Sequence, residues 1–195
     1  IVVTTRLTIA AGGLTIDGPD SPAARIEIIG TDGNTSADSI FFVEAASLTV
    51  RDLVLSHGRA TIFGGGAILL AGDGTSKVVA ERIHFADNTA SSPAGDALGG
   101  AIRTASLTVL EVRDCEFTDN TAEGANAVGA AIRAEGPVLI ERSTFEGNRA
   151  VATNLAQGGA ISAVGGLTVR GSTLVDNHAE GTSVSGGAIA IGTNS

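Results

Sequence analysis

Apolar and polar residues alternate over many short runs of this chain. In Leu7-Thr8-Ile9, Leu14-Thr15-Ile16 and Leu167-Thr168-Val169, every second side chain is apolar. An alternation with a period of two is typical of a β-strand with one buried face. Gly, Asn, Asp and Ser separate the runs, as expected for turns. No window carries the spacing of an amphipathic helix, so the pattern predicts an all-β protein.

Two motifs repeat along the chain at nearly the same interval. A GGAI-like motif recurs with spacings of 34, 30, 29 and 28 residues. It begins at Gly65, Gly99, Gly129, Gly158 and Gly186. An F-x-x-N motif, with Leu174 replacing Phe in its last copy, ends at Asn88, Asn120, Asn148 and Asn177. Two independent landmarks with one period of about thirty residues indicate a repeat architecture.

Each period has room for three short strands, which predicts one coil of a parallel β-solenoid. Strands are also predicted over 26–29, 40–43 and 47–53, within a less regular region, 1–57. Residues 58–195 carry the regular repeats. We therefore expect a single β-helix domain over 1–195, with three strands per coil and roughly six to seven coils.

Alignment of the repeats on the Asn produces columns of similar residues. Three residues before the Asn position, the column is large and apolar: Leu55, Phe85, Phe117, Phe145 and Leu174. Stacked coils bury their inner faces only against their neighbours, so such columns are expected to form the core. The Asn column is expected to stack as an amide ladder at a corner, in the left-handed conformation that Asn tolerates. The Gly pair of GGAI is expected to form another corner.

Two further columns carry alternating charges. Seven residues before the Asn position they read Arg51, Glu81, Arg113, Glu141 and Arg170. The next column alternates in antiphase and reads Asp52, Arg82, Asp114, Arg142 and Gly171. Both are expected to face solvent, where each ion pair contributes only ~0.2–1 kcal/mol. The alternation would also hold the register, because a slipped coil would place like charges side by side.

The amino-acid composition predicts the type of core and excludes some classes of protein. Hydrophobic residues make up 43% of the chain but aromatic residues only 3%, which predicts a core of small and branched side chains. The net charge is −9 and Lys77 is the one lysine, so nucleic-acid binding is excluded for want of clustered cations. No run reaches the ~18 apolar residues of a membrane span. Cys115 is the single cysteine and is expected to be a buried, inert thiol.

The candidate chemical groups are few. Asp87, Asp119 and Asp176 precede the Asn column and are the candidates for a metal site, but Gly147 interrupts their series. We interpret them as solvated corner residues and expect no metal, no cofactor and no catalytic residue. The histidines fall in different columns, without triad-like partners: His57, His84 and His178. The glycosylation-like sequence Asn34-Thr35-Ser36 is assigned no role.

The repeats resemble those of a known group of proteins. GGAI followed by F-x-x-N is similar to the repeat of chlamydial polymorphic membrane proteins. LTIDGP at 14–19 and SLTVRDLVLSHG at 47–58, followed by GGAI, resemble bacterial secreted right-handed parallel β-helix repeat proteins. The resemblance covers nearly the whole chain. It implies a right-handed β-helix, export, exposure on the cell surface and, from the chlamydial relatives, adhesion.

We therefore predict a non-catalytic structural or adhesive module, secreted or on the surface of a bacterial cell. Its expected partners are surface glycans or proteins of a host or neighbouring cell. The alternative is a polysaccharide-binding or polysaccharide-degrading lyase or hydrolase, with its site on loops that contain no aromatic residue: 90–99, 122–129, 150–158 and 179–186. Ice binding would need a regular Thr column, whereas the nearest one is mixed: Thr49, Val79, Glu111, Leu139 and Thr168.

The last residues read as the first strand of a new coil. We expect the native chain to continue as a longer protein, since an open solenoid end favours end-to-end self-association unless it is covered. The alternation of charges would then place an acidic residue about 28 or 29 positions after Arg170.

Overall fold

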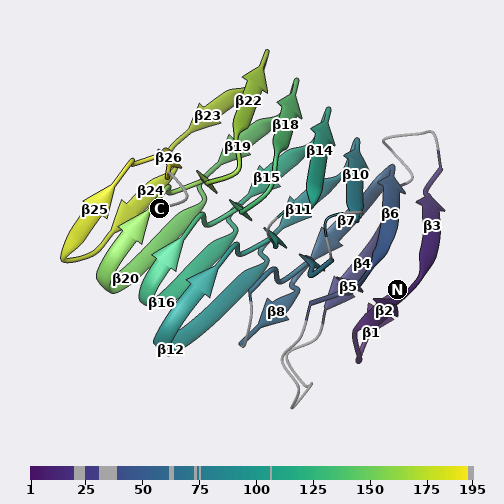
Figure 1. Cartoon of the computed structure of the whole chain (residues 1–195), viewed down its shortest axis with the longest axis horizontal. Coiled ribbons are helices and arrows are strands. Elements are labelled where there is room, and N and C mark those ends of the chain that lie inside the picture. Colours follow the sequence, from purple (N-terminus) through teal and green to yellow (C-terminus); the bar gives the residue numbers. More distant parts are fainter. Residues whose placement is uncertain are drawn as a thin grey trace.

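The computed structural model describes residues 1–19, 25–30, 39–61, 64–72, 74, 76–105 and 107–192. These residues form β-strands and no helix, and every described strand pair is parallel. Successive strands of one sheet come from successive coils, so the sheets run along the axis of a β-helix (Figure 1).

The strands form four sheets, here named A to D. Sheet A contains β1 (Val2–Val3), β4 (Ile26–Gly30), β7 (Leu53–Ser56), β11 (His84–Ala86), β15 (Glu116–Thr118), β19 (Thr144–Glu146) and β23 (Thr173–Val175). Sheet B contains β2 (Leu7–Ile9), β5 (Phe41–Val43), β9 (Ile68–Leu70), β13 (Ile102–Thr104), β17 (Ile132–Ala134), β21 (Ile161–Ala163) and β26 (Ile189–Ile191).

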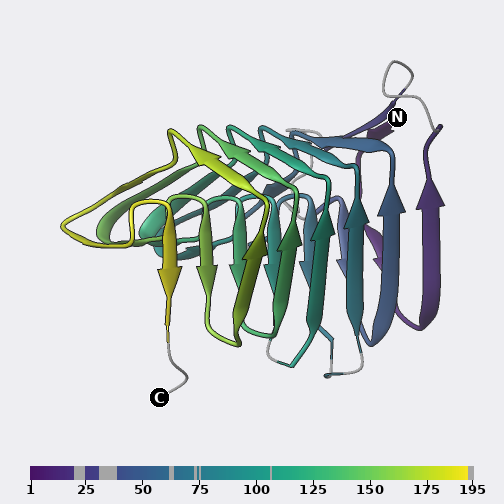
Figure 2. The same cartoon turned by 90° about the horizontal axis from the view of Figure 1, so that it is seen from above.

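Sheet C contains β3 (Gly12–Asp17), β6 (Ala46–Arg51), β10 (Lys77–Glu81), β14 (Val109–Arg113), β18 (Val138–Glu141) and β22 (Leu167–Arg170). Sheet D contains β8 (Arg59–Ala60), β12 (Thr89–Leu98), β16 (Thr121–Val128), β20 (Arg149–Gln157), β24 (His178–Glu180) and β25 (Ser183–Ser185). Each coil passes through sheets B, C, A and D in that order (Figure 2).

The predicted all-β parallel helix is confirmed, with two corrections. About five complete turns are present in place of six or seven, because the remaining strands belong to coils described in only some of the sheets. Each of the complete coils described contributes strands to four sheets in place of three. The additional sheet, D, is made by segments that the sequence predicts as loops.

The long strands of sheet D bow outward and bend near their middle (Figure 2). The pairing register of β12 with β16 shifts between Ser92 and Asp96. Buried alanines from the two halves of each strand form a small core of their own: Ala90, Ala97, Ala122, Ala127, Ala150 and Ala156. Pairing with the same segment of the next coil satisfies the backbone, so these strands form without a strong alternating pattern.

The main core is built from stacked columns. Phe85, Phe117 and Phe145 are fully buried, and their rings stack with centroids 4.5 Å apart. Leu55 and Leu174 pair with the first and last of these phenylalanines and continue the column. Offset or stacked aromatic pairs add ~0.5–1.5 kcal/mol beyond the burial of their area. The stack therefore ties three coils together through the few aromatic residues that the chain has.

The asparagines form a continuous amide ladder beside this core. The Nδ2 of Asn88 donates to Oδ1 of Asn120, that of Asn120 to Asn148, and that of Asn148 to Asn177, at 3.0, 2.9 and 2.8 Å. Each Nδ2 also donates to a main-chain carbonyl of the preceding coil, at 2.8–3.0 Å. Each Oδ1 accepts from a backbone N–H of the preceding coil, including Gly58 N. In Asn120 and Asn148, both donors and both acceptor positions of the amide are thus used.

The left-handed backbone conformation lies one residue earlier than expected. The residues that precede the Asn position have positive φ values: 56° at His57, 55° at Asp87, 54° at Asp119, 67° at Gly147 and 52° at Asp176. The asparagines themselves are absent from the positive-φ residues. The expectation that Asn adopts this conformation is therefore wrong, and the αL residue turns the Asn side chain inward, where it is needed for the ladder.

The first Gly of GGAI does occupy a left-handed corner. Gly99, Gly129 and Gly158 all have φ of 63°, and a Cβ there would collide with the carbonyl of the Ile three residues later. The second position is less strict, because Ala130 occupies it in one coil. The hydrogen bond from Ala130 N to Gly158 O is 3.3 Å, compared with 2.7 Å from Gly100 N to Ala130 O.

The ladder predicts a large effect for Asn120→Ala. The change removes four side-chain hydrogen bonds and leaves the buried amide and N–H of Asn88 without their acceptor. We expect a loss of about 3 kcal/mol in the free energy of unfolding, measured by urea denaturation. Asn126→Ala is the control, since the amide of Asn126 donates to Asp96 at an exposed site. Equal losses in the two variants would contradict the role of the ladder.

Candidate functional site

The charged columns are continuous in the structure. Strand pairing aligns Arg51 with Glu81, Glu81 with Arg113, Arg113 with Glu141, and Glu141 with Arg170. Arg51 Nε lies 2.7 Å from Glu81 Oε2, Arg113 Nε lies 3.4 Å from Glu141 Oε2, and Arg170 Nη1 lies 3.7 Å from Glu141 Oε1. Glu81 and Glu141 keep only 23% and 21% of their side-chain surface exposed, so these groups are more buried than the sequence predicts.

The column extends further than the repeat alignment shows. Asp17 pairs in register with Arg51, and their side chains are 3.1 Å apart. The alternation therefore begins one coil earlier, in the region without GGAI. The repeat alignment missed Asp17 because its coil has no Asn on which it could be aligned.

The second charged column forms forked ion pairs at a corner. Arg82 Nε and Nη2 each donate to Asp52 at 2.7 Å, and Arg142 donates to Asp114 at 2.8 and 2.9 Å. The Arg hydrogen bonds lower the pKa of Asp52 and of Asp114, against the opposing effect of burial. Asp52 is only 8% exposed, which corrects the expectation that this column faces solvent throughout.

All five members of this column have positive φ, which explains the last one. The values are 55° at Asp52, 53° at Arg82, 53° at Asp114, 48° at Arg142 and 56° at Gly171. Gly adopts this conformation at little cost. At Gly171 the alternation of charges is therefore interrupted, but the left-handed conformation of the corner is kept.

A neighbouring carboxylate joins the network. Glu111 accepts from Lys77 at 2.6 Å and from Arg113 at 2.7 Å. The hydrogen bond from Lys77, followed by that from Arg113, lowers the pKa of Glu111. The sequence missed this group because its column, which includes Thr49, Val79, Leu139 and Thr168, has no common chemistry.

The metal candidates stack at one corner of the coils without converging on a common point. Asp87, Asp119 and Asp176 are exposed at the corner, and Gly147 separates the last two by a coil. Among the described residues, no three His, Cys, Asp or Glu side chains converge as metal ligands would. The three carboxylates therefore form no common site in this arrangement.

The remaining candidates also occupy separate positions. His57 is exposed at the left-handed corner, His84 lies 3.1 Å from Thr118 Oγ1, and His178 is exposed at the start of β24. Cys115 is 2% exposed, and burial raises the pKa of its thiol to about 12. The sequence Asn34-Thr35-Ser36 lies outside the described residues.

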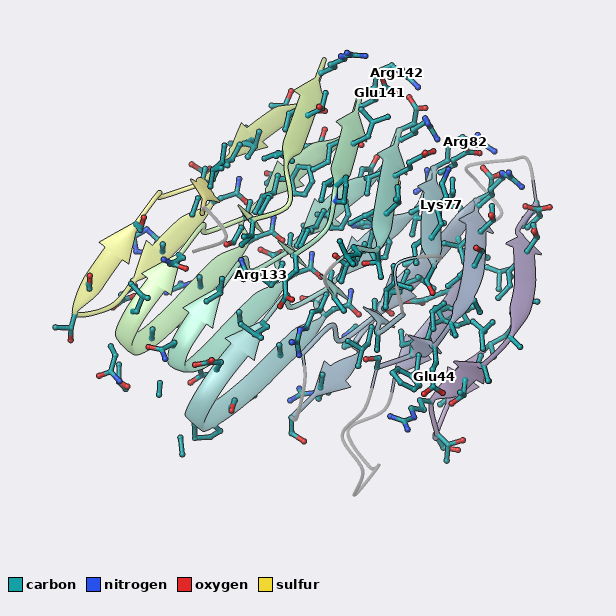
Figure 3. All side chains as sticks on the ribbon, in the orientation of Figure 1. Glu44, Lys77, Arg82, Arg133, Glu141 and Arg142 are labelled. Atoms are coloured by element: carbon teal, nitrogen blue, oxygen red, sulfur yellow. The ribbon has the colours of Figure 1, made fainter. Side chains whose placement is uncertain are left out.

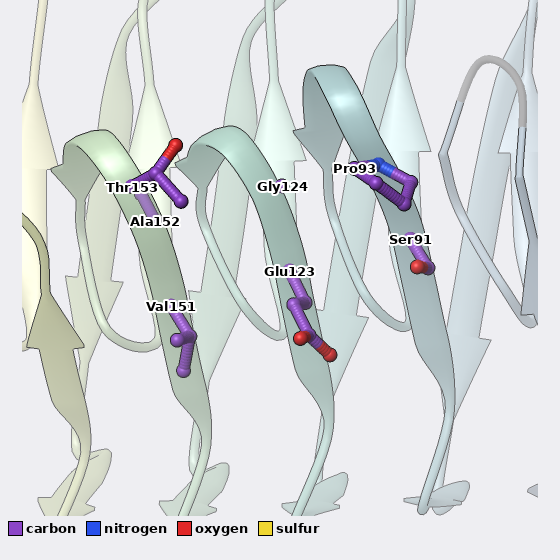
Figure 4. Close-up of a pocket in the computed structure, with 7 residues that line it drawn as sticks. All are labelled: Ser91, Pro93, Glu123, Gly124, Val151, Ala152 and Thr153. Carbon is purple, nitrogen blue, oxygen red and sulfur yellow. The ribbon is translucent and has the colours of Figure 1, made fainter.

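The bent strands of sheet D enclose a shallow hollow of about 220 Å³ (Figure 4). It spans three coils and is lined by Ser91, Pro93, Glu123, Gly124, Val151, Ala152 and Thr153. Glu123 is the one carboxylate among these lining residues, and it is exposed. Sequence reasoning identified these segments as a possible binding face but did not single out Glu123.

The side chains on the outside of the coils give each sheet a different surface (Figure 3). Arg82, Glu141 and Arg142 belong to the charged columns at the end of sheet C, whereas Arg133 projects from sheet B. No helix suited to crossing a bilayer occurs in the described part of the chain.

The family model described as right-handed β-helix region matches residues 38–195. The chain belongs to this family. The match establishes the right-handed sense of the coils and includes every GGAI repeat. Comparison with curated proteins gave no significant match, and neither did comparison with solved structures.

The charged column predicts that Glu141→Lys is destabilising. The change would place a third cation between Arg113 and Arg170, and close to Arg142. We expect a loss of ~1 kcal/mol in unfolding free energy, reduced by added salt. Thr144→Lys on the neighbouring outward column of sheet A is the control. If both variants melt at the same temperature in low salt, the column does not stabilise the fold.

The forked pairs predict a dependence of stability on acid pH. Because the folded-state pKa of Asp52 is depressed, its contribution is complete above the unfolded value of about 3.9 and is lost as the pH falls through the folded value. Asp52→Asn removes this contribution, so the difference in stability between wild type and variant should shrink below about pH 4. Asp87→Asn is the control, since Asp87 has the same φ of 55°. A constant difference from pH 7 to 2.5 would contradict the linkage.

Proposed function

We propose that this β-helix is a non-catalytic structural module of a secreted or surface-exposed bacterial protein, and that it binds partners along its side. The observation that supports this most directly is the continuity of its columns. The stacked phenylalanines, the Asn ladder and the alternating charges connect each coil to the next.

Such a stack is suited to hold a lateral surface in a fixed geometry. From β8 onward, successive coils hydrogen-bond to one another through four parallel sheets, at a spacing of ~4.8 Å. Bending would have to disturb several buried columns at once, in a core where Asn88, Asn120 and Asn148 are fully buried. Rigid scaffolds that display segments of variable sequence are common in recognition.

Sheet D offers the display surface. Its bent strands bring residues of equivalent position side by side: Ser91 pairs with Glu123, Glu123 with Val151, and Val151 with Glu180. The hollow over these strands could receive one group of a surface glycan or protein. The similarity of the GGAI and F-x-x-N repeats to those of chlamydial polymorphic membrane proteins supports adhesion as the use of this face.

The hollow also bears on the alternative function, a polysaccharide-degrading enzyme. A polysaccharide hydrolase uses two carboxyl groups about 5 to 9.5 Å apart. Glu123 could be one of them, and Glu180 is the carboxylate two coils further along the same outward column. Glu180 lies 3.6 Å from Arg149, and Val151 separates it from Glu123. This arrangement favours binding over cleavage.

An oligosaccharide array combined with a turnover assay tests the proposal. We expect retention of surface glycans without new reducing ends or unsaturated products. Val151→Arg should obstruct the hollow and weaken retention at least tenfold, whereas Thr144→Arg on sheet A should leave it unchanged. Cleavage that is abolished in Glu123→Gln but kept in Glu116→Gln would establish the enzyme in place of the adhesive module.

A further inference from the structure

On the outer face of sheet B, the charges do not alternate in sign as they do in the charged columns of sheet C. Arg103 pairs in register with Arg133 on the next coil. Among the described residues that pair between strands, this is the one pair of like formal charges. Like charges directly opposite each other destabilise a sheet. The chain has a net charge of −9 and few cations, so the juxtaposition calls for a reason other than stability.

A carboxylate and a hydroxyl group lie close to the pair. Arg103 Nη2 lies 3.7 Å from Glu135 Oε1, and Arg133 Nη1 donates to Ser162 Oγ at 3.1 Å. The Nε of Arg133 is buried and has no hydrogen-bond partner among the described residues. Burial lowers the pKa of Arg133, as does the charge of Arg103, while Glu135 opposes the shift. An anion placed between the two guanidinium groups would offset both costs.

An apolar hollow of about 250 Å³ adjoins the pair. It is lined by Phe42, Leu69, Ala71, Arg103 and Ala105, from three successive coils. Phe42 and Leu69 belong to the same outward column as the two arginines. The small Ala71 and Ala105 leave the hollow open between the larger Glu44 and Glu135, which occupy the corresponding positions in the coils on either side. Figure 3 labels Glu44 and Arg133, three coils apart.

The Phe42 ring is held in place from one side. The guanidinium carbon of Arg6 lies 4.5 Å from its centroid. The ring therefore forms a firm end wall, opposite the end formed by Arg103. A ligand in this site would lie along the axis, with its apolar part over Leu69 and its anionic part over the arginines.

We propose that this face of sheet B binds a polypeptide segment that carries a carboxylate next to an aliphatic or aromatic side chain. The carboxylate would accept hydrogen bonds from Arg103 and Arg133, which are suited to planar, two-pronged recognition. The apolar side chain would fill the hollow. A sugar fits less well, since its hydroxyl groups would lose water against an apolar lining that offers few partners. The site lies on another sheet than the Glu123 hollow and does not depend on it.

A peptide titration tests this proposal. The probes are a capped peptide of sequence Gly-Gly-Leu-Asp-Gly-Gly, its Asn-for-Asp and Ala-for-Leu analogues, and a glucuronate-containing oligosaccharide. We expect the first peptide to shift the NMR signal of the Arg133 Nε–H, and each analogue to bind at least tenfold more weakly. Arg133→Gln should weaken binding at least tenfold, and Ala105→Leu should do so by filling the hollow. Arg149→Gln, an exposed arginine of sheet D, is the matched control.

Thermal melting separates this role from a structural one. Removal of one of two like charges should leave the melting temperature of Arg133→Gln unchanged or raised. The proposal is overturned if no peptide binds, or if Arg133→Gln melts much earlier with peptide binding unaffected. It is also overturned if the oligosaccharide binds through the same arginines and the peptide does not, because the site would then recognise an acidic glycan.

Discussion

The structure depends on one constraint, which is that every coil must present matching chemistry to the coil above and to the coil below. In a parallel β-helix the neighbours of a residue are about thirty positions away in sequence, at ~4.8 Å in space. A side chain that suits its own coil but not the adjacent one is therefore costly. The columns meet this demand in different ways. Phenylalanine rings stack, buried amides hydrogen-bond to one another in a ladder, and charges alternate in sign.

At the corners, the backbone conformation determines where the side chains of the columns point. Three left-handed positions recur in the regular coils: one at the end of sheet C, one at the end of sheet A, and one at the first Gly of GGAI, before sheet B. The second places an exposed Asp or Gly outside and directs the following Asn into the interior, where its amide can bond to the next coil. The first carries the forked Asp–Arg pairs, and at Gly171 the conformation is kept although the charge is lost. At these positions the backbone conformation takes priority over the side chain.

The outward-facing columns do not have to pack in the core, so their residues can differ from coil to coil. The hollow around Glu123 and the hollow beside Arg103 each draw on three coils, and each is lined by residues of several types. The like-charged arginines stand out because the remaining strand-paired charges of the described chain alternate. A β-helix can thus keep one repeated interior and present a different surface on each side.

The sequence by itself determined what repeats. The two motifs, the inward columns, the amide ladder and the alternating charges could be aligned because one physical demand recurs in every coil. The tertiary structure decided what does not repeat. Segments such as 90–99 lack an alternating pattern, and only pairing with the equivalent segments of other coils makes them strands. The left-handed conformation belongs to the residue before each Asn, since the direction of the amide is set by the corner. Asp17 joins the charged column only through strand register, and the hollow beside Arg103 arises where Ala71 and Ala105 of two successive coils lie between larger residues of the coils on either side.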